Sequence, residues 1–275
     1  MMVRGPRVSS IHHRGVALLL LIPGLGCGSR TGLTATSLDP CGDAGAERAC
    51  FSVCGQGVEV CVNGYWQGCT APRPKAPVLT GVVRDFRSTH PDMESALGDD
   101  PGIVEPLLGA DDKPVYAGLT QTTHGKAAFD QWYRDVPGVN LSTSLTLALT
   151  QSGKELSYAD GTFFPIDGQL FGNEGNPHNF HFTFEVKSQF RYLGGELFTF
   201  TGDDDLWVFI NRRLAIDLGG VHGTTSQTVS LDAKAAELGI VVGQVYSFHL
   251  FFAERHTSGS SFRLETSIDE FDLCE

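Results

Sequence analysis

The sequence is poor in charged residues and has no cluster of Lys and Arg. Charged residues are 19% of the 275 residues, and Gly alone takes 33 positions. Coiled coils and charge-driven disordered chains need far more charge, so both classes are excluded. The formal net charge is -12, from 20 Lys and Arg against 32 Asp and Glu. Without a basic cluster we expect no nucleic-acid partner, and an acidic surface favours cations.

The sequence also lacks an apolar run long enough to cross a membrane. The apolar stretch at residues 16–22 follows three arginines, and a bilayer span takes about 20 residues. This pattern predicts a secretory signal peptide over residues 1–26. Cys27 follows a small residue, as in a bacterial lipobox, although Gly24 stands where Leu is usual. We therefore expect a lipid anchor at Cys27, with ordinary cleavage nearby as the alternative.

Both alternatives predict export, to the cell surface through a lipid anchor in the outer membrane or to the extracellular space. Cysteine usage agrees, because setting Cys27 aside leaves an even number of cysteines, as oxidising compartments favour. These six are Cys41, Cys50, Cys54, Cys61, Cys69 and Cys274.

Five of the six cysteines fall within residues 41–69, a stretch with too few aliphatic residues to fold on an apolar core alone. We predict a disulfide-stapled module over residues 41–70, with the odd cysteine paired to Cys274. A zinc knuckle is the rival interpretation, but the spacings lack the paired Cys-x-x-Cys pattern of zinc sites. Residues 27–40 are interpreted as a tether, and residues 71–77 as a Pro-rich linker.

Residues 78–272 contain neither a further linker nor a cysteine before the last strand, and they predict one β domain. Residues 180–186 alternate with aromatics on one face, as half-buried strands do. Further predicted strands are residues 197–201, 206–210, 214–218, 228–231, 245–252 and 262–268. Only residues 127–135 and 233–238 favour helix. Short runs divided by Gly, Asp and Ser predict an all-β sandwich.

Residues 206–210 and 214–218 predict a hairpin across residues 211–213. A loop that begins at Asn is a hairpin signal, but Arg in a left-handed conformation costs about 1 kcal/mol. We therefore expect the longer form of the loop. Leu206, Val208 and Ile210 share one strand face, and apolar Trp207 and Phe209 share the other. The strand is expected to be central and covered on both sides.

Several motifs resemble bacterial fibro-slime domain proteins. They are GDDDLWVFIN (202–211), LAIDLGGVH (214–222), LFFAERHTSGSSFRLET (250–266), VVRDF (82–86), HPDME (90–94), FFPIDGQLFG (163–172) and NFHFTFE (179–185). The fibro-slime domain is itself similar to the protective-antigen β-sandwich of flocculins, toxins and glycosidase inserts. The resemblance implies a lectin-like β-sandwich with few short helices, preceded here by the disulfide module.

The wider family implies a calcium site at the aspartate run. Its pattern Asp-Asp-Gly-x-x-Leu-Tyr-Ile-Asp-Gly overlays residues 203–212, with Asp205 and Arg212 replacing the glycines. In that family a cis-linked Asp pair binds Ca²⁺, and the ion binds sugar hydroxyls. We expect Asp203, Asp204 and Asp205 to hold Ca²⁺, because carboxylates are hard ligands and adjacent like charges need a cation. The alternative is a solvated turn.

A second polar constellation follows the predicted strand 245–252. It contains Glu254, Arg255, His256 and Ser258, and the resemblance implies that this loop selects the sugar. Arg and His side chains clamp hydroxyls and carboxylates by directed hydrogen bonds. A polar turn at residues 219–223, with His222, is expected near the same end of the sandwich.

These features predict a surface or extracellular-matrix protein that binds a polysaccharide or glycan through Ca²⁺. A structural slime or envelope component, in which any Ca²⁺ only stabilises the sandwich, is the alternative. We expect no enzyme: neither HExxH nor GxSxG occurs. A site of two His with carboxylates at His222, His256, Glu254 and Asp203 is the distant catalytic alternative.

Overall fold

The computed structural model describes residues 40–52, 55–71, 77–118 and 120–268. Within them the chain is mostly β, with two short helices, α1 (Lys126–Phe129) and α2 (Leu231–Leu238). The all-β prediction is therefore confirmed. Neither helix of the described residues has the length and apolar character of a membrane span.

The cysteine-rich module is a three-stranded antiparallel sheet. Its strands are β1 (Glu47–Ser52), β2 (Gly55–Val62) and β3 (Tyr65–Gln67). Disulfides join Cys41 to Cys61 and Cys50 to Cys69, which confirms disulfides rather than a zinc knuckle for these four cysteines. Cys27, Cys54 and Cys274 lie outside the described residues, so the lipid anchor and the third disulfide stay predictions.

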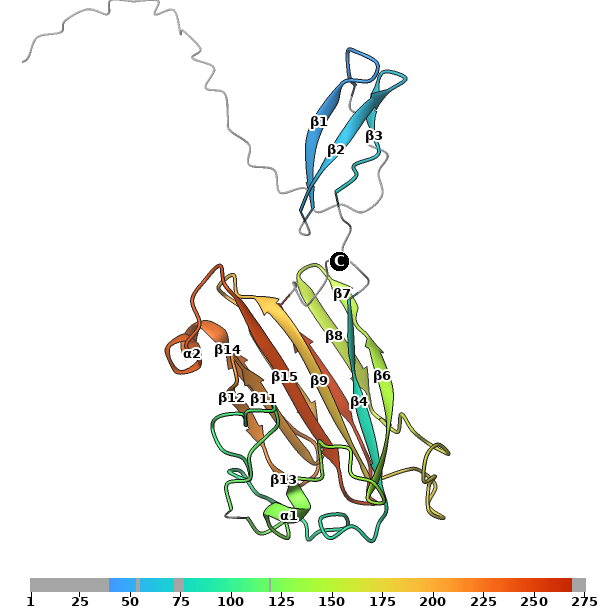
Figure 1. The fold of residues 1–275 in the computed structure, drawn as a ribbon, viewed down its shortest axis with the longest axis vertical. Helices are drawn as coiled ribbons and strands as arrows, with labels where there is room; N and C mark the ends of the chain where they lie inside the picture. Colours follow the sequence, from blue (N-terminus) through green and yellow to red (C-terminus); the bar gives the residue numbers. More distant parts are fainter. Residues whose placement is uncertain (1–39, 53–54, 72–76, 119, 269–275) are drawn as a thin grey trace, which may run out of the picture.

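The large domain is a sandwich of two antiparallel sheets (Figure 1). One has six strands in the order β12-β11-β15-β9-β4-β6, and the other five in the order β14-β10-β16-β8-β7. The strands of the first sheet are β4 (Val78–Phe86), β6 (Asn140–Ala148), β9 (Phe182–Arg191), β11 (Asp205–Ile210), β12 (Arg213–Leu218) and β15 (Val245–Glu254). Those of the second are β7 (Thr150–Ser152), β8 (Glu155–Asp160), β10 (Leu197–Gly202), β14 (Thr225–Ser230) and β16 (Phe262–Thr266). A further two-stranded sheet pairs β5 (Gly98–Asp99) with β13 (Gly220–Val221).

Two apolar layers cover the six-stranded sheet. The inner core lies between the sheets and includes Leu206, Val208 and Ile210 of β11. The outer core forms where the β4–β6 connection, residues 87–139, covers the other face. Its members are Ile103, Val104, Leu108, Phe129, Trp132, Tyr133, Trp207, Phe209, Phe251 and Ala253. The prediction of a central strand covered on both sides is confirmed, because alternate side chains of β11 enter different layers.

The predicted hairpin is β11–β12, but its loop is shorter than expected. Asn211 and Arg212 form a two-residue turn with φ of 50° and 64°. Bonds to neighbouring segments hold both residues in this left-handed conformation: Asn211 Nδ2 donates to the Leu238 carbonyl at 2.9 Å, and Arg212 Nη2 donates to the Gly109 carbonyl at 2.6 Å. Tertiary hydrogen bonds therefore offset the cost of placing Arg in the turn.

Other expectations from the sequence need correction. Helix α1 ends at Phe129 instead of extending to residue 135. The amides of Gln131 and Trp132 donate to carbonyls three residues earlier, which tightens the chain into turns, and the Trp132 side chain enters the outer core. Strand β14 begins at Thr225, and Leu231 already belongs to α2, whose N-cap is Ser230. Strands β4, β6, β7 and β8 were not predicted, and the Ser and Thr content of β6 hides its alternation.

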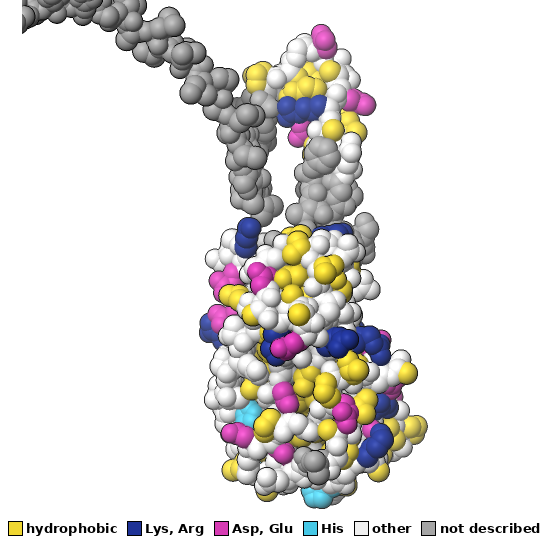
Figure 2. Space-filling view, turned by 90° about the vertical axis from the view of Figure 1, so that its left-hand side faces the viewer, with side chains coloured by type: hydrophobic (Ala, Val, Ile, Leu, Met, Phe, Trp, Pro, Cys, Tyr) yellow, Lys and Arg dark blue, Asp and Glu magenta, His cyan; other side chains and the backbone are white. Residues whose placement is uncertain are grey.

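Figure 2 shows the face of the molecule that carries α2, where acidic, basic and apolar side chains are interspersed. The apolar members of the loop after α2 are prominent in solvent, since Val241 is 62% exposed and Val242 is 61% exposed. That face therefore carries charges of both signs and no broad field of one sign.

Candidate functional site

Three segments meet where β10 leads into β11. The Asp203 amide donates to the Ser261 carbonyl at 3.3 Å, and the Asp204 amide donates to the His222 carbonyl at 3.2 Å. The Thr224 hydroxyl donates to Asp203 Oδ1 at 2.5 Å. The structure thus brings the aspartate run, the polar turn at residues 219–223 and the β15–β16 loop together, as the sequence predicted.

The three aspartates of the run occupy different environments. Asp203 is half-buried, Asp204 is 4% exposed and Asp205 is fully buried. The expected cis linkage is wrong for this structure, because every peptide bond of the described residues is trans. The chain turns instead through a left-handed conformation at Asp204, with φ of 50°. Asp tolerates that conformation better than most residues do.

Asp205 is not available to hold an ion, which corrects its predicted role. Its Oδ2 accepts from Arg255 Nε at 2.5 Å, and its Oδ1 accepts from the Gly220 amide at 2.7 Å. Both side chains of this ion pair are fully buried. The charge of Asp205 is therefore balanced inside the protein by Arg255.

Arg255 is likewise not on the surface, so the expectation that it contacts a sugar is wrong here. Its Nη1 donates to the carbonyls of Asp92 at 3.1 Å and Thr122 at 2.7 Å, and its guanidinium lies 4.7 Å from the Trp132 ring centroid. Burial is tolerated because each of the three guanidinium nitrogens donates to a carboxylate, carbonyl or hydroxyl acceptor. Arg255 joins the aspartate run to two turns of the β4–β6 connection.

Asp92, of the HPDME motif, holds the same β4–β6 connection in place. Its fully buried carboxylate accepts from Trp132 Nε1 at 2.9 Å and from the His124 amide at 2.5 Å. Glu94 belongs to the same motif, and its Oε1 accepts a hydrogen bond from His181 Nε2 at 2.7 Å. The motif therefore builds the support beneath the site.

Asp204 and Glu254 form a buried carboxyl pair. Asp204 Oδ2 accepts from the Arg255 amide at 2.7 Å, while Glu254 is 1% exposed and its Oε2 has no hydrogen-bond partner among the described residues. Burial raises the pKa of Asp204, and the charge of Asp205 adds to the rise. Burial also raises the pKa of Glu254 well above its usual range, with the charge of Asp204 as the second cause. Such a pair needs a proton or a cation between its members.

The exposed part of the site is a polar rim of Asp203, His222, Thr224, His256 and Ser258. His256 Nδ1 lies 3.1 Å from Ser258 Oγ, and His222 Nδ1 lies 3.0 Å from the Gly223 carbonyl. Of the residues predicted to contact sugar, His222, His256 and Ser258 therefore lie on the rim, whereas Glu254 lies beneath it.

Sequence reasoning missed Glu94, which lies beside the rim. Its Oε2 is 3.8 Å from His256 Nε2 and accepts from the Thr257 hydroxyl at 3.3 Å. The one available signal was its place in the HPDME motif. His181, also bonded to Glu94, is 2% exposed, and His249 is 4% exposed. Both are packed residues.

Asn140 of the sequon-like Asn-Leu-Ser triplet has a structural role. Its Nδ2 donates to the carbonyls of Gln131 at 3.0 Å and Arg134 at 2.8 Å, and the residue is 5% exposed. This amide is therefore engaged in holding the turn before β6.

No group of three or more His, Cys, Asp or Glu side chains in the described part of the chain can hold a metal ion by itself. The distant catalytic alternative, two His with Glu254 and Asp203, therefore finds no cluster here. An ion at Asp203, Asp204 and Glu254 would need further oxygens from hydroxyls, backbone or ligand.

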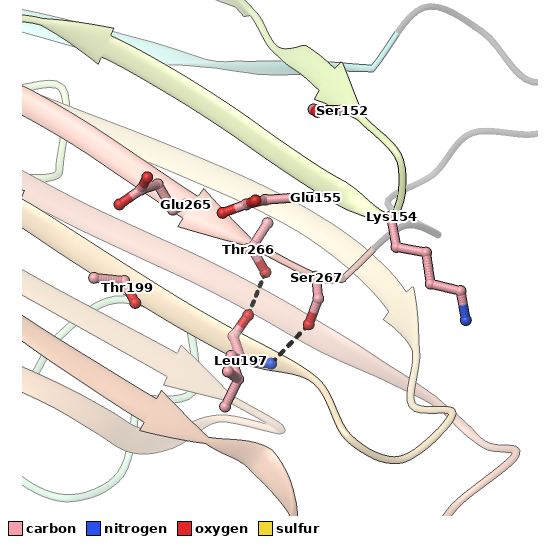
Figure 3. Close-up of a pocket in the computed structure, with 8 residues that line it drawn as sticks. All are labelled: Ser152, Lys154, Glu155, Leu197, Thr199, Glu265, Thr266 and Ser267. Carbon is pink, nitrogen blue, oxygen red and sulfur yellow. Dashed lines mark hydrogen bonds between the residues drawn. The ribbon is translucent and has the colours of Figure 1, made fainter.

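A separate groove of about 490 Å³ lies on the outer face of the five-stranded sheet (Figure 3). It lies at the opposite ends of β10 and β16 from the aspartate run. Its lining is Ser152, Lys154, Glu155, Leu197, Thr199, Glu265, Thr266 and Ser267. The Leu197 amide donates to Ser267 Oγ at 2.9 Å within it. None of the predicted site residues lines this groove.

Residues 160–270 match the PA14 domain. This stretch contains the aspartate run, the turn with His222 and the β15–β16 loop. The match supports the resemblance to the protective-antigen β-sandwich. The assignment to the fibro-slime proteins stays a prediction.

Proteins of Dictyostelium discoideum are similar to most of this chain. Protein psiR is 40% identical over 227 residues, which are 72% of this chain and 22% of psiR. Protein psiD is 39% identical over 236 residues, which are 77% of this chain and 46% of psiD. The chain therefore spans less than half the length of these relatives.

Solved structures with similar folds include a PA14 sugar-binding domain from an RTX adhesin. It is 8% identical with a TM-score of 0.30, over 68% of this chain and 89% of that domain. The PA14 domain of the MpAFP antifreeze protein is 10% identical with a TM-score of 0.30, over 76% of this chain and 93% of that domain. Likenesses of this size do not bear on the ligand of this chain.

Proposed function

We propose that this chain is an exported protein of the cell surface or extracellular matrix whose PA14 domain binds carbohydrate through Ca²⁺, without catalysis. The observation that carries the proposal is the buried Asp204–Glu254 pair, which lies directly beneath the rim at the junction of three loops. Export is supported by the signal-like N-terminus, the proposed anchor at Cys27 and the two disulfides of the module.

Carboxyl groups on and beneath the rim would supply part of the shell of a calcium ion, with further oxygens from hydroxyls, backbone or the sugar. Glu254 Oε2 is buried without a hydrogen-bond partner among the described residues, and Asp204 beneath the rim and Asp203 on it add hard carboxylate oxygens of the kind Ca²⁺ prefers. Asp205 stays outside this set because Arg255 and the Gly220 amide occupy its oxygens. When bound, the ion would compensate the carboxylates and offer coordination positions to sugar hydroxyls.

The proposed ligand is an uncharged sugar. The one cation of the predicted constellation, Arg255, is fully buried and bonded to protein acceptors. The rim presents hydroxyls, imidazoles and the Asp203 carboxylate, and it carries neither Lys nor Arg. Uronate or sulfate groups would find no Lys or Arg among the rim residues beside the ion and would lie near the carboxylates of Asp203 and Glu94, whereas neutral hydroxyls match the rim's donors and acceptors.

The test is a thermal melt of the purified full chain with and without millimolar Ca²⁺, followed by binding to neutral and acidic glycan arrays. Ca²⁺ should raise the Tm by ligand linkage. Asp204→Asn and Glu254→Gln should remove most of this shift together with glycan binding. Glu237→Gln, a change at a carboxylate 73% exposed on α2, is the matched control and should keep both.

A structural envelope role is the second candidate, and the same carboxyl pair is the reason. One shared proton can balance Asp204 and Glu254 in place of an ion. In that case the parent chain would show no Tm shift with Ca²⁺ and no glycan binding in either the presence or the absence of a chelator. Ca²⁺ stabilisation without glycan binding would favour the same role with a structural ion.

A further inference from the structure

Strand β6 forms one edge of the six-stranded sheet, and β4 is its one paired strand in the part of the chain that the structure describes (Figure 1). The pairing runs without a register shift from Val78 opposite Ala148 to Phe86 opposite Asn140. An edge strand offers alternate backbone N–H and C=O groups to solvent or to another strand. Among the described residues, no backbone hydrogen bond from outside β4 reaches residues 141–148.

Among the described residues, the other sheet edges are short or covered, whereas β6 is a long edge with no backbone partner beyond β4. At the opposite edge, β12 is covered by the β4–β6 connection, since the Leu214 amide donates to the Pro106 carbonyl at 3.0 Å and the Leu108 amide donates to the Arg212 carbonyl at 3.1 Å. In the five-stranded sheet, β7 has three residues, and β14 lies beside β12, where the Asp217 amide donates to Gln227 Oε1 at 3.3 Å. Short or covered edges resist pairing with other chains.

The sequence of β6 lacks the usual devices that prevent strand addition. Residues 136–153 contain no Asp, Glu, Lys or Arg, and β6 itself contains neither Pro nor Gly. The odd positions from Leu141 to Leu147 are Leu or Thr, and the positions between them are Ser or Thr, so one face of the strand is richer in Leu and the other carries hydroxyls. Leu141 is 42% exposed on this edge. An uncharged, regular, nine-residue edge is a site for β-augmentation.

We propose that β6 pairs with β6 of a second copy of this chain, in an antiparallel arrangement centred on Ser144. In that register Leu141 faces Leu147 of the other copy, Thr143 faces Leu145, and Ser142 faces Thr146. Residues opposite each other share a sheet face, so leucines meet on the inner face and hydroxyls on the outer face. The two six-stranded sheets then join into one, related by a two-fold axis.

Charge favours a second copy at this edge. The chain has a formal net charge of -12, so two copies repel each other wherever acidic surfaces meet. The stretch 136–153 is uncharged, and contact there brings no like charges together. The side chain of Leu141, 42% exposed in the single chain, would also be removed from water where it packs against Leu147 of the other copy.

The experiment is sedimentation velocity of the purified full chain from low micromolar to several hundred micromolar concentration. A dimer should form, and Ser144→Lys should weaken it by at least about tenfold, because two lysines then face each other on the axis. Ser142→Lys, at an exposed edge position, is a second variant with the same expected direction. Thr150→Lys on β7 adds the same charge at another edge and should leave the dimer unchanged.

Circular dichroism melts of each variant establish that the fold is retained. A monomer at all concentrations would overturn the proposal, as would a dimer that survives both β6 substitutions. A dimer lost equally in Thr150→Lys would show that added charge, and not the β6 edge, controls association, and would also overturn it.

Discussion

Phe251 and Phe252 are neighbours on β15 and are both fully buried, but they enter different layers. Phe252 points into the inner core, where its ring centroid lies 5.4 Å from that of Phe262 and 5.8 Å from that of Phe163. Phe251 points into the outer core, 4.9 Å from the ring of Tyr133. One strand thus holds two kinds of packing together.

The layers differ in how specific their contacts are. The inner core is built from apolar residues, and such packing is non-directional. The outer layer adds buried ionic bonds to its aromatic residues: Arg84 Nη1 donates to Glu185 Oε2 at 3.0 Å, and Lys113 Nζ donates to the same carboxylate at 2.5 Å. Directional bonds fix the β4–β6 connection in one position, and Arg255 uses that position to support the candidate site.

The largest expected effect is that of Arg255→Met in the outer layer. The change leaves the Asp205 carboxylate buried without its cation and removes the Arg255 donor from the Thr122 carbonyl. We expect a loss of about 3–5 kcal/mol in the free energy of unfolding. Urea denaturation of parent and variant provides the measurement.

The double variant Arg255→Met with Asp205→Leu is the control. Removing both charges should restore most of the lost stability, since a buried ion pair can be replaced by apolar side chains of similar volume. If the double variant is as unstable as the single one, the ion pair is not the source of the loss.

The neighbouring phenylalanines allow the layers to be separated. Phe252→Ala and Phe251→Ala should each cost about 3 kcal/mol through lost burial and a cavity. Hydrogen exchange should then accelerate throughout both sheets for Phe252→Ala, and mainly in residues 87–139 for Phe251→Ala. Identical exchange profiles in the two variants would show that the layers unfold as one unit.

A smaller effect is expected from Asp85, which joins β4 to the loop before β9. Its Oδ2 accepts from the Phe171 amide at 2.7 Å and its Oδ1 accepts from Asn179 Nδ2 at 2.9 Å. Burial raises the pKa of Asp85 from 3.8 to about 6 in the folded chain. Because the folded protein holds this proton more tightly than the unfolded chain, its stabilising contribution is present at low pH and is lost as pH rises through about 6.

Asp85→Asn removes this titration. The stability of the parent relative to the variant should therefore fall by on the order of 2 kcal/mol between about pH 4 and pH 7. Urea denaturation at several pH values measures the difference. A difference that is constant with pH would contradict the raised pKa.

Sequence patterns predicted the inner layer better than the outer one. Alternation located β9, short apolar runs located β11 and β15, and the apolar character of both faces of β11 predicted two covering layers. The β4–β6 connection has no periodicity, so its position over the sheet was not predictable. Its buried contacts depend on single residues such as Asp92 and Trp132, whose partners are distant in sequence.

The candidate site shows the same division. Composition and motif spacing brought attention to Asp203, Asp204 and the β15–β16 loop, and these do meet in space. The sequence could not separate Asp204 from Asp205, or Arg255 from His256, because adjacent residues of similar chemistry differ only in which way the backbone points them.

The amino-acid sequence by itself determined the β class, the central strand and the location of the aspartate run. It also predicted that the cysteines of residues 41–70 form disulfides within one module. Local alternation, turn residues and cysteine parity suffice for these, since each depends on near neighbours. Only the tertiary structure decided that Arg255 supports the site from within and that Glu254 and Asp204 share a buried environment. It also decided that β6 lies at an edge of its sheet, with β4 as its one paired strand among the described residues. Burial and pairing are properties of distant segments brought together, and no local pattern encodes them.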